Sequence, residues 1–249
     1  MRLVCHIGNR ICQIRTPPRN VAAEVVKLIG SYDVAVIGGG AAGLSGALML
    51  ARSRRSVVVI DAGSPRNAPA AGVHGFLSRD GIAPAELLDR GRAEVRSYGG
   101  RLINGEVSFA AKEAERFRMT LTDGRTVCAR RLLVATGLAD ELPDIAGLRE
   151  RWGRDVIHCP YCHGWEVRDK KIGVLATGPM SVHQALLFRQ LSAHVAFFSH
   201  TTPPTDEQAE QLTARGIGIV DGPVASLEVA DERIVGVMLD DGLGSAATQ

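Results

Sequence analysis

The sequence predicts an α/β protein built from two three-layer domains of one plan, each with a doubly wound sheet between layers. Buried-type β runs alternate with segments of helical period, which is typical of parallel βαβ units. The order strand, turn, helix, strand that starts at residue 33 starts again at residue 172. With 249 residues, the chain is long enough for two domains of ordinary size.

Composition narrows the function classes. The net charge of +2, with no long run of one sign, argues against nucleic acid or an anionic membrane as partner. Residues 34–51 carry no charge, but their five glycines favour strand, turn and helix over a membrane span. Arginines 10, 15 and 19 interrupt any apolar leader, and five cysteines form no regular framework. We therefore expect a cytoplasmic protein that does not engage a membrane.

The first half shows the plan most clearly. Residues 1–30 have no clear period and are expected to be a poorly ordered extension. The predicted elements that follow are a strand at 33–37, a turn at 38–43, helix 44–53, strand 57–60, helix 84–98, short strands around 107, 117–121 and 127, and a strand at 131–135. Asp123-Gly124 is the expected hairpin turn within this set.

The second half repeats the plan and stops early. The predicted elements are a strand at 172–175, a turn at 177–180, helix 181–191, strand 195–199, helix 205–215, strand 217–220 and a strand pair around 231–232. Residues 243–249 after the last Asp-Gly pair have no strand period. We predict an extension at 1–30, a first domain at 31–145 and a second domain at 146–249 that is truncated at its C-terminus.

A glycine-rich turn carries the first chemical signal. Residues 38–43 read G-G-G-A-A-G, matching G-x-G-x-x-G between a β run and a helix, and Asp61 closes the next strand. Gly38 suits a tight turn, Gly40 lets the backbone approach a pyrophosphate, and Gly43 allows close packing of helix and strand. The helix N-terminus then offers free N–H groups to phosphate, and Asp61 can accept from ribose hydroxyls.

The tract His158-Cys-Pro-Tyr-Cys-His-Gly164 carries the second signal. A zinc knuckle is one interpretation, but a closed zinc site needs four ligands and the sequence has no second Cys-x-x-Cys. A redox pair needs only Cys159 and Cys162, and a helix start beside them favours a thiolate. Inert buried thiols are the third alternative. We favour the redox interpretation and assign no metal site.

These motifs together resemble the low-molecular-weight thioredoxin reductase family, over residues 31–242. The resemblance rests on the 38–43 fingerprint, Ala135-Thr136-Gly137 and the Cys-x-x-Cys-x-Gly motif. Residues 159–166, with Arg66-Asn67 and residues 74–77, are closer to a branch that includes dithiol oxidases. The resemblance implies two Rossmann-like domains, an FAD-binding domain at 31–145 and an inserted NAD(P)-type domain that carries the cysteines.

The resemblance also implies site residues and partners. FAD is the expected cofactor, a homodimer the expected assembly, and a thioredoxin-like protein or a small dithiol or disulfide the expected substrate. It places Cys162 beside the flavin and gives Cys159 the exchange with substrate. The expected cofactor-binding residues are Gly38, Gly40, Ala41, Ala42, Gly43, Asp61, Ala62, Arg66, Asn67, Thr136, Gly137 and Gly178.

The sequence departs from the family at the redox motif. His163 stands where the family usually has Asp, and with His158 it is a candidate general acid/base; packing is the alternative for both.

The second fingerprint also departs. Its first and third glycines are replaced by Ala176 and Ser181, and residues 199–201 read Ser-His-Thr where reductases place an arginine pair. NADPH is therefore expected to bind at a degenerate site, because its 2′-phosphate needs charged donors, and oxygen becomes an alternative electron acceptor.

The preferred function is FAD-dependent thiol/disulfide exchange of thioredoxin reductase type. An oxygen-dependent dithiol oxidase of the same fold and a non-catalytic remnant are the alternatives. In the family a returning C-terminal segment contacts the flavin, so we also expect this chain to hold FAD poorly. We further expect the unfinished second sheet to expose apolar surface.

Overall fold

The computed structural model describes residues 1–5, 8–11 and 27–240, which form two compact units. Unit 1 comprises Met1–Asn9, Pro69–Gly81 and Asp140–Gln249, and unit 2 comprises Arg10–Ala68 and Ile82–Ala139. Among the described residues, every helix is too short or too polar to span a bilayer. Each unit has its own sheet and its own core.

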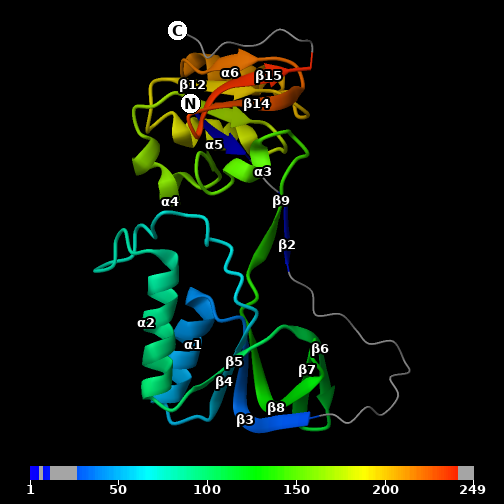
Figure 1. Ribbon diagram of the computed structural model, residues 1–249. Helices are drawn as coiled ribbons and strands as arrows, with labels where there is room; N and C mark the ends of the chain where they lie inside the picture. Colours follow the sequence, from blue (N-terminus) through cyan, green and yellow to red (C-terminus); the bar gives the residue numbers. More distant parts are fainter. Residues whose placement is uncertain (6–7, 12–26, 241–249) are drawn as a thin grey trace. The chain divides into compact units, whose positions relative to one another are not determined.

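Unit 2 is built on a six-stranded sheet of order β5-β4-β3-β8-β7-β6 (Figure 1). Its strands are β3 (Lys27–Ile37), β4 (Val57–Asp61), β5 (Arg101–Asn104), β6 (Val107–Glu113), β7 (Arg116–Leu121) and β8 (Arg125–Val134). The neighbouring strands β5, β4, β3 and β8 are parallel to one another. Strands β8, β7 and β6 form an antiparallel meander. This is the parallel sheet with a hairpin extension that the first half of the sequence predicts.

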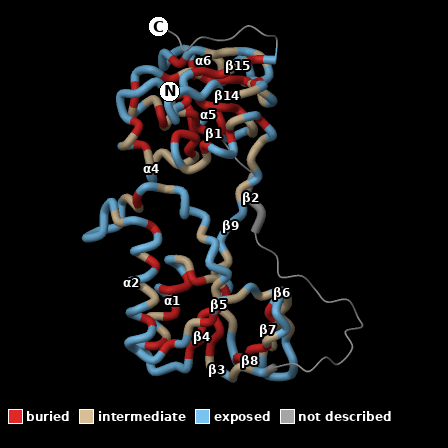
Figure 2. Tube along the Cα trace, viewed as in Figure 1, coloured by how far each residue is buried: buried red, intermediate tan, exposed pale blue. Residues whose placement is uncertain are grey.

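Both faces of the unit 2 sheet are covered. Helices α1 (Ala41–Arg52) and α2 (Pro84–Ser97) pack on one face, where they bury Val34 and Val36 of β3. The residue between them, Ala35, belongs to a second cluster with the meander strands. Residues 34–37 of β3 and 57–60 of β4 are buried, as the colours of Figure 2 show for this part of the sheet. Successive side chains of β3 point to opposite faces of the sheet, and both faces are buried. The strand is therefore apolar at every position in this stretch.

Two elements of unit 2 are longer than the sequence predicts. β3 extends back to Lys27, and the separate strands expected at 127 and 131–135 are the single strand β8. The exposed Arg130 and Arg131 suggest a break in the pattern, yet β8 stays paired with β3 from Arg125 to Val134. Backbone pairing with a long neighbour therefore overrides the local charge pattern.

Unit 1 contains a five-stranded parallel sheet of order β10-β1-β11-β12-β13. Its strands are β1 (Arg2–Cys5), β10 (Val156–Ile157), β11 (Ile172–Leu175), β12 (Val195–Phe198) and β13 (Gly218–Val220). Helices α5 (Ser181–Phe188) and α6 (Asp206–Ala214) contribute to the core on one face. The hairpin of β14 (Val224–Ala230) and β15 (Arg233–Leu239) contributes to the core on the other. The three-layer plan predicted for this half is present.

The first strand of the chain differs from expectation. Leu3, Val4 and Cys5 are fully buried in β1, which lies between β10 and β11. These residues are therefore not a poorly ordered extension but a paired strand inside the sheet. Four residues are too few to show a strand period, and their partners lie far along the chain, with Leu3 paired to Val156 and Gly173. The rest of the predicted extension up to residue 26, apart from 8–11, and the tail after 240 lie outside the described residues.

A segment of the predicted first domain clusters with unit 1 instead. Pro69–Gly81 belongs to unit 1, where Pro69 packs against Gly153 and His74 contacts Glu166. Side-chain contacts of this kind cannot be read from a local pattern.

The smaller elements complete the description: β2 (Gly8–Ile11) paired with β9 (Leu138–Glu141), α3 (Leu148–Arg151), α4 (Pro160–His163) and a 3₁₀ helix (Trp165–Val167).

Candidate redox centre and nucleotide-binding turns

The glycine turn of unit 2 joins the end of β3 to the start of α1. Gly38 has φ +102°, and a Cβ there would collide with the carbonyl oxygen of Ala135. A Cβ on Gly43 would collide with the carbonyl oxygen of Gly38. Both positions therefore require glycine, one for its left-handed backbone and both for close packing.

Gly40 is glycine for a different reason. A Cβ on Gly40 would meet nothing within 4 Å, so the residue faces open space rather than packed protein. It is the N-cap of α1, and no side chain there accepts a hydrogen bond from the first N–H groups of the helix. The first turn of the helix also carries no acidic residue. Ala41 and Ala42 are exposed beside it. The helix terminus thus leaves its N–H groups accessible to a phosphate, which fits the pyrophosphate of a dinucleotide such as FAD.

The other predicted cofactor residues of unit 2 lie at the carboxyl ends of neighbouring strands. Asp61 ends β4, packs against Gly39, and has its Oδ2 3.3 Å from Arg92 Nη2. Thr136 lies beside the Gly38 turn, directly after β8. Gly137 follows Thr136, Ala62 follows Asp61, and Arg66 and Asn67 are exposed farther along that loop. The glycine turn, Asp61 and Thr136 therefore lie together at the carboxyl ends of the strands, where open α/β sheets bind their ligands.

The cysteines of the Cys-x-x-Cys motif lie in the single turn of α4 and at its N-cap. Cys159 is the N-cap, and its Sγ accepts a hydrogen bond from the Cys162 N–H at 3.2 Å. The two Sγ atoms are 2.6 Å apart, with Cys162 exposed and Cys159 half-buried. Only a small movement is needed to join them, since a disulfide requires about 2.05 Å. The backbone donor also suits a thiolate on Cys159.

His158 is held from two sides. Its Nδ1 is 2.9 Å from the carbonyl oxygen of Cys5 in β1, and the Gln184 side-chain amide donates to the His158 carbonyl. A carbonyl can only accept, so the 2.9 Å contact requires the proton on Nδ1. The Gln184 amide nitrogen also lies 3.3 Å from this Nδ1. β1 therefore orients the residue that precedes Cys159.

His163 is half-buried at the end of α4. Its Nε2 is buried and has no hydrogen-bond partner in the part of the chain that the structure describes. Burial lowers the pKa of His163, which keeps the ring neutral near pH 7. A neutral imidazole beside a dithiol is in the form that accepts a proton.

The surroundings of the redox motif include residues that no sequence pattern indicates. His74 lies 3.5 Å from Glu166 and 3.5 Å from Asp80, which brings the segment Pro69–Gly81 to the redox side of unit 1. Tyr161, between the two cysteines, is 81% exposed, and Trp165, which follows them, is 67% exposed. The Arg168 guanidinium lies over the Trp165 ring, 4.0 Å from its centroid. The unusual exposure of the two rings, rather than their type, is the signal, and exposure is not readable from sequence.

The corresponding turn of unit 1 differs from that of unit 2. The buried Ser181 accepts hydrogen bonds at its Oγ from the N–H of Thr177 at 3.2 Å and of Gly178 at 3.3 Å. Amides that could face a phosphate are thus bound by the chain itself. This turn does not fit a dinucleotide phosphate as the turn of unit 2 does.

The position expected to hold a 2′-phosphate is also changed. His200 Nδ1 accepts a hydrogen bond from the Val224 N–H at 2.9 Å, and burial lowers the pKa of His200. A neutral ring that already accepts a backbone hydrogen bond does not replace an arginine pair.

Metal binding was the alternative for the cysteine motif. Within residues 1–5, 8–11 and 27–240, no group of three or more His, Cys, Asp or Glu side chains is placed to hold a metal ion. The cysteine pair therefore has no described ligands with which to complete a zinc site.

Known proteins share this arrangement. The pyridine nucleotide-disulphide oxidoreductase family model matches residues 32–243. Thioredoxin reductase tcpT of Claviceps purpurea is 39% identical over 68% of this chain, which spans 55% of that protein. Thioredoxin reductase sirT of Leptosphaeria maculans is 31% identical over 85% of this chain, which spans 70% of that protein.

Solved structures agree with the sequence relatives. The crystal structure of HlmI is 50% identical with a TM-score of 0.84, covering 92% of this chain and 72% of that chain. An oxidoreductase from Agrobacterium tumefaciens is 40% identical with a TM-score of 0.80, covering 87% of this chain and 72% of that chain.

Proposed function

This chain belongs to the pyridine nucleotide-disulphide oxidoreductase family, and on that premise we propose that it exchanges electrons between FAD and the Cys159–Cys162 pair. Oxidation of the two thiols to a disulfide releases two electrons and two protons, and bound FAD supplies the acceptor for both electrons. A dithiol or disulfide substrate then exchanges with Cys159, as in a thioredoxin reductase. We place this activity in a cytoplasmic homodimer.

The separation of the sulfurs carries the proposal. The 2.6 Å between the two Sγ atoms, with a backbone N–H on one of them, suits a pair that opens and closes. His163, neutral because burial lowers its pKa, is the proposed proton acceptor for the exchanging thiol. The open terminus of α1 at Gly40 supports FAD as the resident cofactor.

A second function is favoured by the turn of unit 1. Because Ser181 binds the amides of Thr177 and Gly178, NADPH loses its phosphate donors there. We infer an oxidase direction, in which a dithiol substrate reduces the cysteine pair and molecular oxygen takes the two electrons and two protons as hydrogen peroxide. The exposed rings of Tyr161 and Trp165 suit an apolar small dithiol as well as a protein surface.

Both functions can be tested anaerobically by following the visible spectrum of the FAD-loaded protein. Dithiothreitol should bleach the flavin, Cys162→Ser should abolish the bleaching, and excess NADPH should bleach it slowly. Rapid stoichiometric bleaching by NADPH would refute the oxidase direction and leave the reductase. Purified protein that takes up no FAD would favour the remnant interpretation, and bleaching that persists in Cys162→Ser would refute the redox pair.

A further inference from the structure

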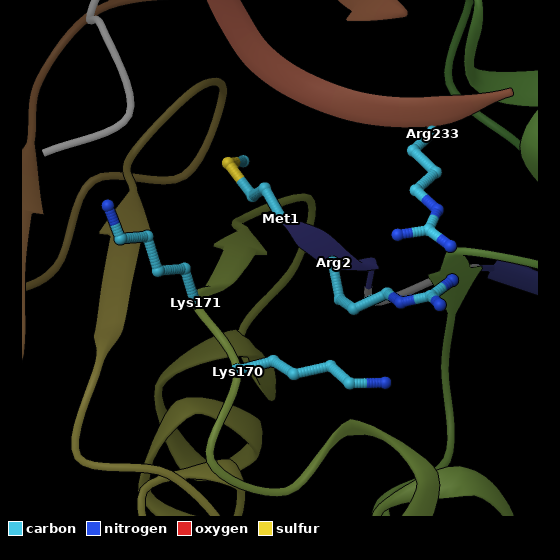
Figure 3. Close-up of a pocket in the computed structure, with 5 residues that line it drawn as sticks. All are labelled: Met1, Arg2, Lys170, Lys171 and Arg233. Atoms are coloured by element: carbon cyan, nitrogen blue, oxygen red, sulfur yellow. The ribbon is translucent and has the colours of Figure 1, made fainter. Parts of the chain in front are cut away.

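Unit 1 contains a cavity of about 340 Å³ that the redox function does not use. It is lined by Met1, Arg2, Lys170, Lys171 and Arg233. The sticks in Figure 3 show the ends of Arg2, Lys170 and Arg233 on one side of Met1, whereas the Lys171 side chain points away from them. No acidic residue is among those that line the cavity. Its volume lies within the range of about 300–1,000 Å³ that is usual for small-molecule sites.

The cavity lies at the N-terminal ends of the parallel strands of unit 1, and the redox centre lies at their C-terminal ends. Arg2 begins β1 and Lys171 directly precedes β11, whereas Cys5 and Thr177 lie at the other ends of these parallel strands. Four residues of strand separate the two ends by roughly 13 Å. A ligand in this cavity would therefore not touch Cys159 or Gly178.

Positive charge in the cavity is not offset by its own residues. Arg2 donates to the carbonyl oxygen of Arg154 at 3.2 Å, and Lys170 donates to the carbonyl oxygen of Glu166 at 2.6 Å. The Arg233 side chain has no hydrogen bond or ion pair within the described part of the chain. None of these three cations pairs with a carboxylate among the described residues, so each keeps donors to spare.

The nearest carboxylates are already bound. Arg151 forms a buried ion pair with Asp155, with Nε 2.7 Å from Oδ1, and its Nη1 lies 3.1 Å from Glu232 Oε2. The pKa of Lys170 is lowered first by partial burial and then by the charges of Arg2, Arg168 and Arg233. Glu166 offsets part of this effect on Lys170. Like charges held this close together cost free energy, and a bound anion would lower that cost.

We propose that this cavity binds a small phosphorylated anion. The guanidinium groups of Arg2 and Arg233 suit the paired oxygens of a phosphate, and Lys170 adds a charge without fixed geometry. Binding would join the first residue of β1 to the residue before β11 and to the first residue of β15. An anion that binds only folded protein stabilises unit 1 by mass action.

Thermal unfolding of the 249-residue chain loaded with FAD tests the proposal, with tryptophan fluorescence as the probe. FAD occupies the turn of unit 2, which would otherwise take phosphate itself. Pyrophosphate should raise the midpoint of unit 1 relative to sodium chloride at equal ionic strength, and ADP should do the same. Citrate tests carboxylates: a shift as large as that from pyrophosphate would overturn the preference for phosphate.

Variants locate the effect. Lys170→Gln/Arg233→Gln changes two exposed side chains and should weaken pyrophosphate binding by at least about tenfold. The matched control Lys112→Gln removes an exposed cation from β6 in unit 2 and should respond like the wild type. A wild type without a pyrophosphate shift, or a double variant that shifts equally, would overturn the proposal. Thiol-driven flavin bleaching in the double variant should be unchanged, which separates this site from the proposed redox function.

Discussion

Replacing Leu3 by alanine measures how much β1 contributes to unit 1. Leu3 is fully buried and packs in one core cluster with Val156, Leu175 and Ile234, so its truncation removes contacts from the centre of the sheet. Buried Leu→Ala changes usually cost 2–5 kcal/mol, and a central strand leaves little room for the site to collapse. We expect the free energy of unfolding of unit 1 to fall by about 3–5 kcal/mol.

Tryptophan fluorescence makes this measurement specific to unit 1. The sequence has two tryptophans, and Trp152 and Trp165 both lie in unit 1. A urea titration followed by their emission therefore reports that unit even if unit 2 unfolds separately.

Leu28→Ala is the matched control. Leu28 also lies in a strand, β3, but is 55% exposed, so its truncation should change stability by about 0.5 kcal/mol or less. If residues 1–5 were an undocked extension, Leu3→Ala would be as neutral as this control. Equal urea midpoints and slopes for Leu3→Ala and wild type would refute the central position of β1.

Three further predictions concern the redox centre and its neighbours. His163→Ala should slow thiol-driven turnover by ~10²- to 10⁴-fold without changing FAD content, and steady-state assays across pH check whether a titrating group has been lost. Ser181→Gly frees the amides of Thr177 and Gly178 and should speed anaerobic flavin bleaching by NADPH, measured by stopped flow. The pKa of His200 is lowered by burial from an unfolded value of 6.5, so the unfolded state binds more protons and stability falls as pH drops below that value. His200→Asn keeps an acceptor and tolerates the positive φ of 41°, and should flatten the loss between pH 6.5 and 5 in urea titrations.

Local chemistry made the glycine turn predictable. Gly38 and Gly43 are required by contacts with backbone only a few residues away or on the adjacent strand, and the motif spacing encodes them directly. The capping box at Thr205 and Gln208, which starts α6, is also local and agrees with the predicted helix start. Such elements depend on interactions within one βαβ unit, so sequence alone identifies them.

At the redox centre, the sequence predicts which residues take part but not what surrounds them. The spacing of Cys159 and Cys162 predicted that their sulfurs could meet, because two residues between them form one turn. The partners of His158 and His163 were not predictable, because they depend on Cys5, Gln184 and burial by distant segments. Residue types indicated acid/base chemistry, and only packing decides which ring nitrogen is bound or buried.

The sequence by itself determined the α/β class, the two copies of the plan and the positions of the glycine and cysteine motifs, because each follows from short-range periodicity or spacing. The tertiary structure alone decided that Arg2–Cys5 form the inner strand β1 of unit 1. The physical reason is that a four-residue strand has almost no intrinsic preference, and its stability comes from pairing with β10 and β11 more than 150 residues away. The same long-range pairing brings Arg2 to Lys171 and Cys5 to His158, so both edges of the sheet depend on contacts that no local pattern reveals.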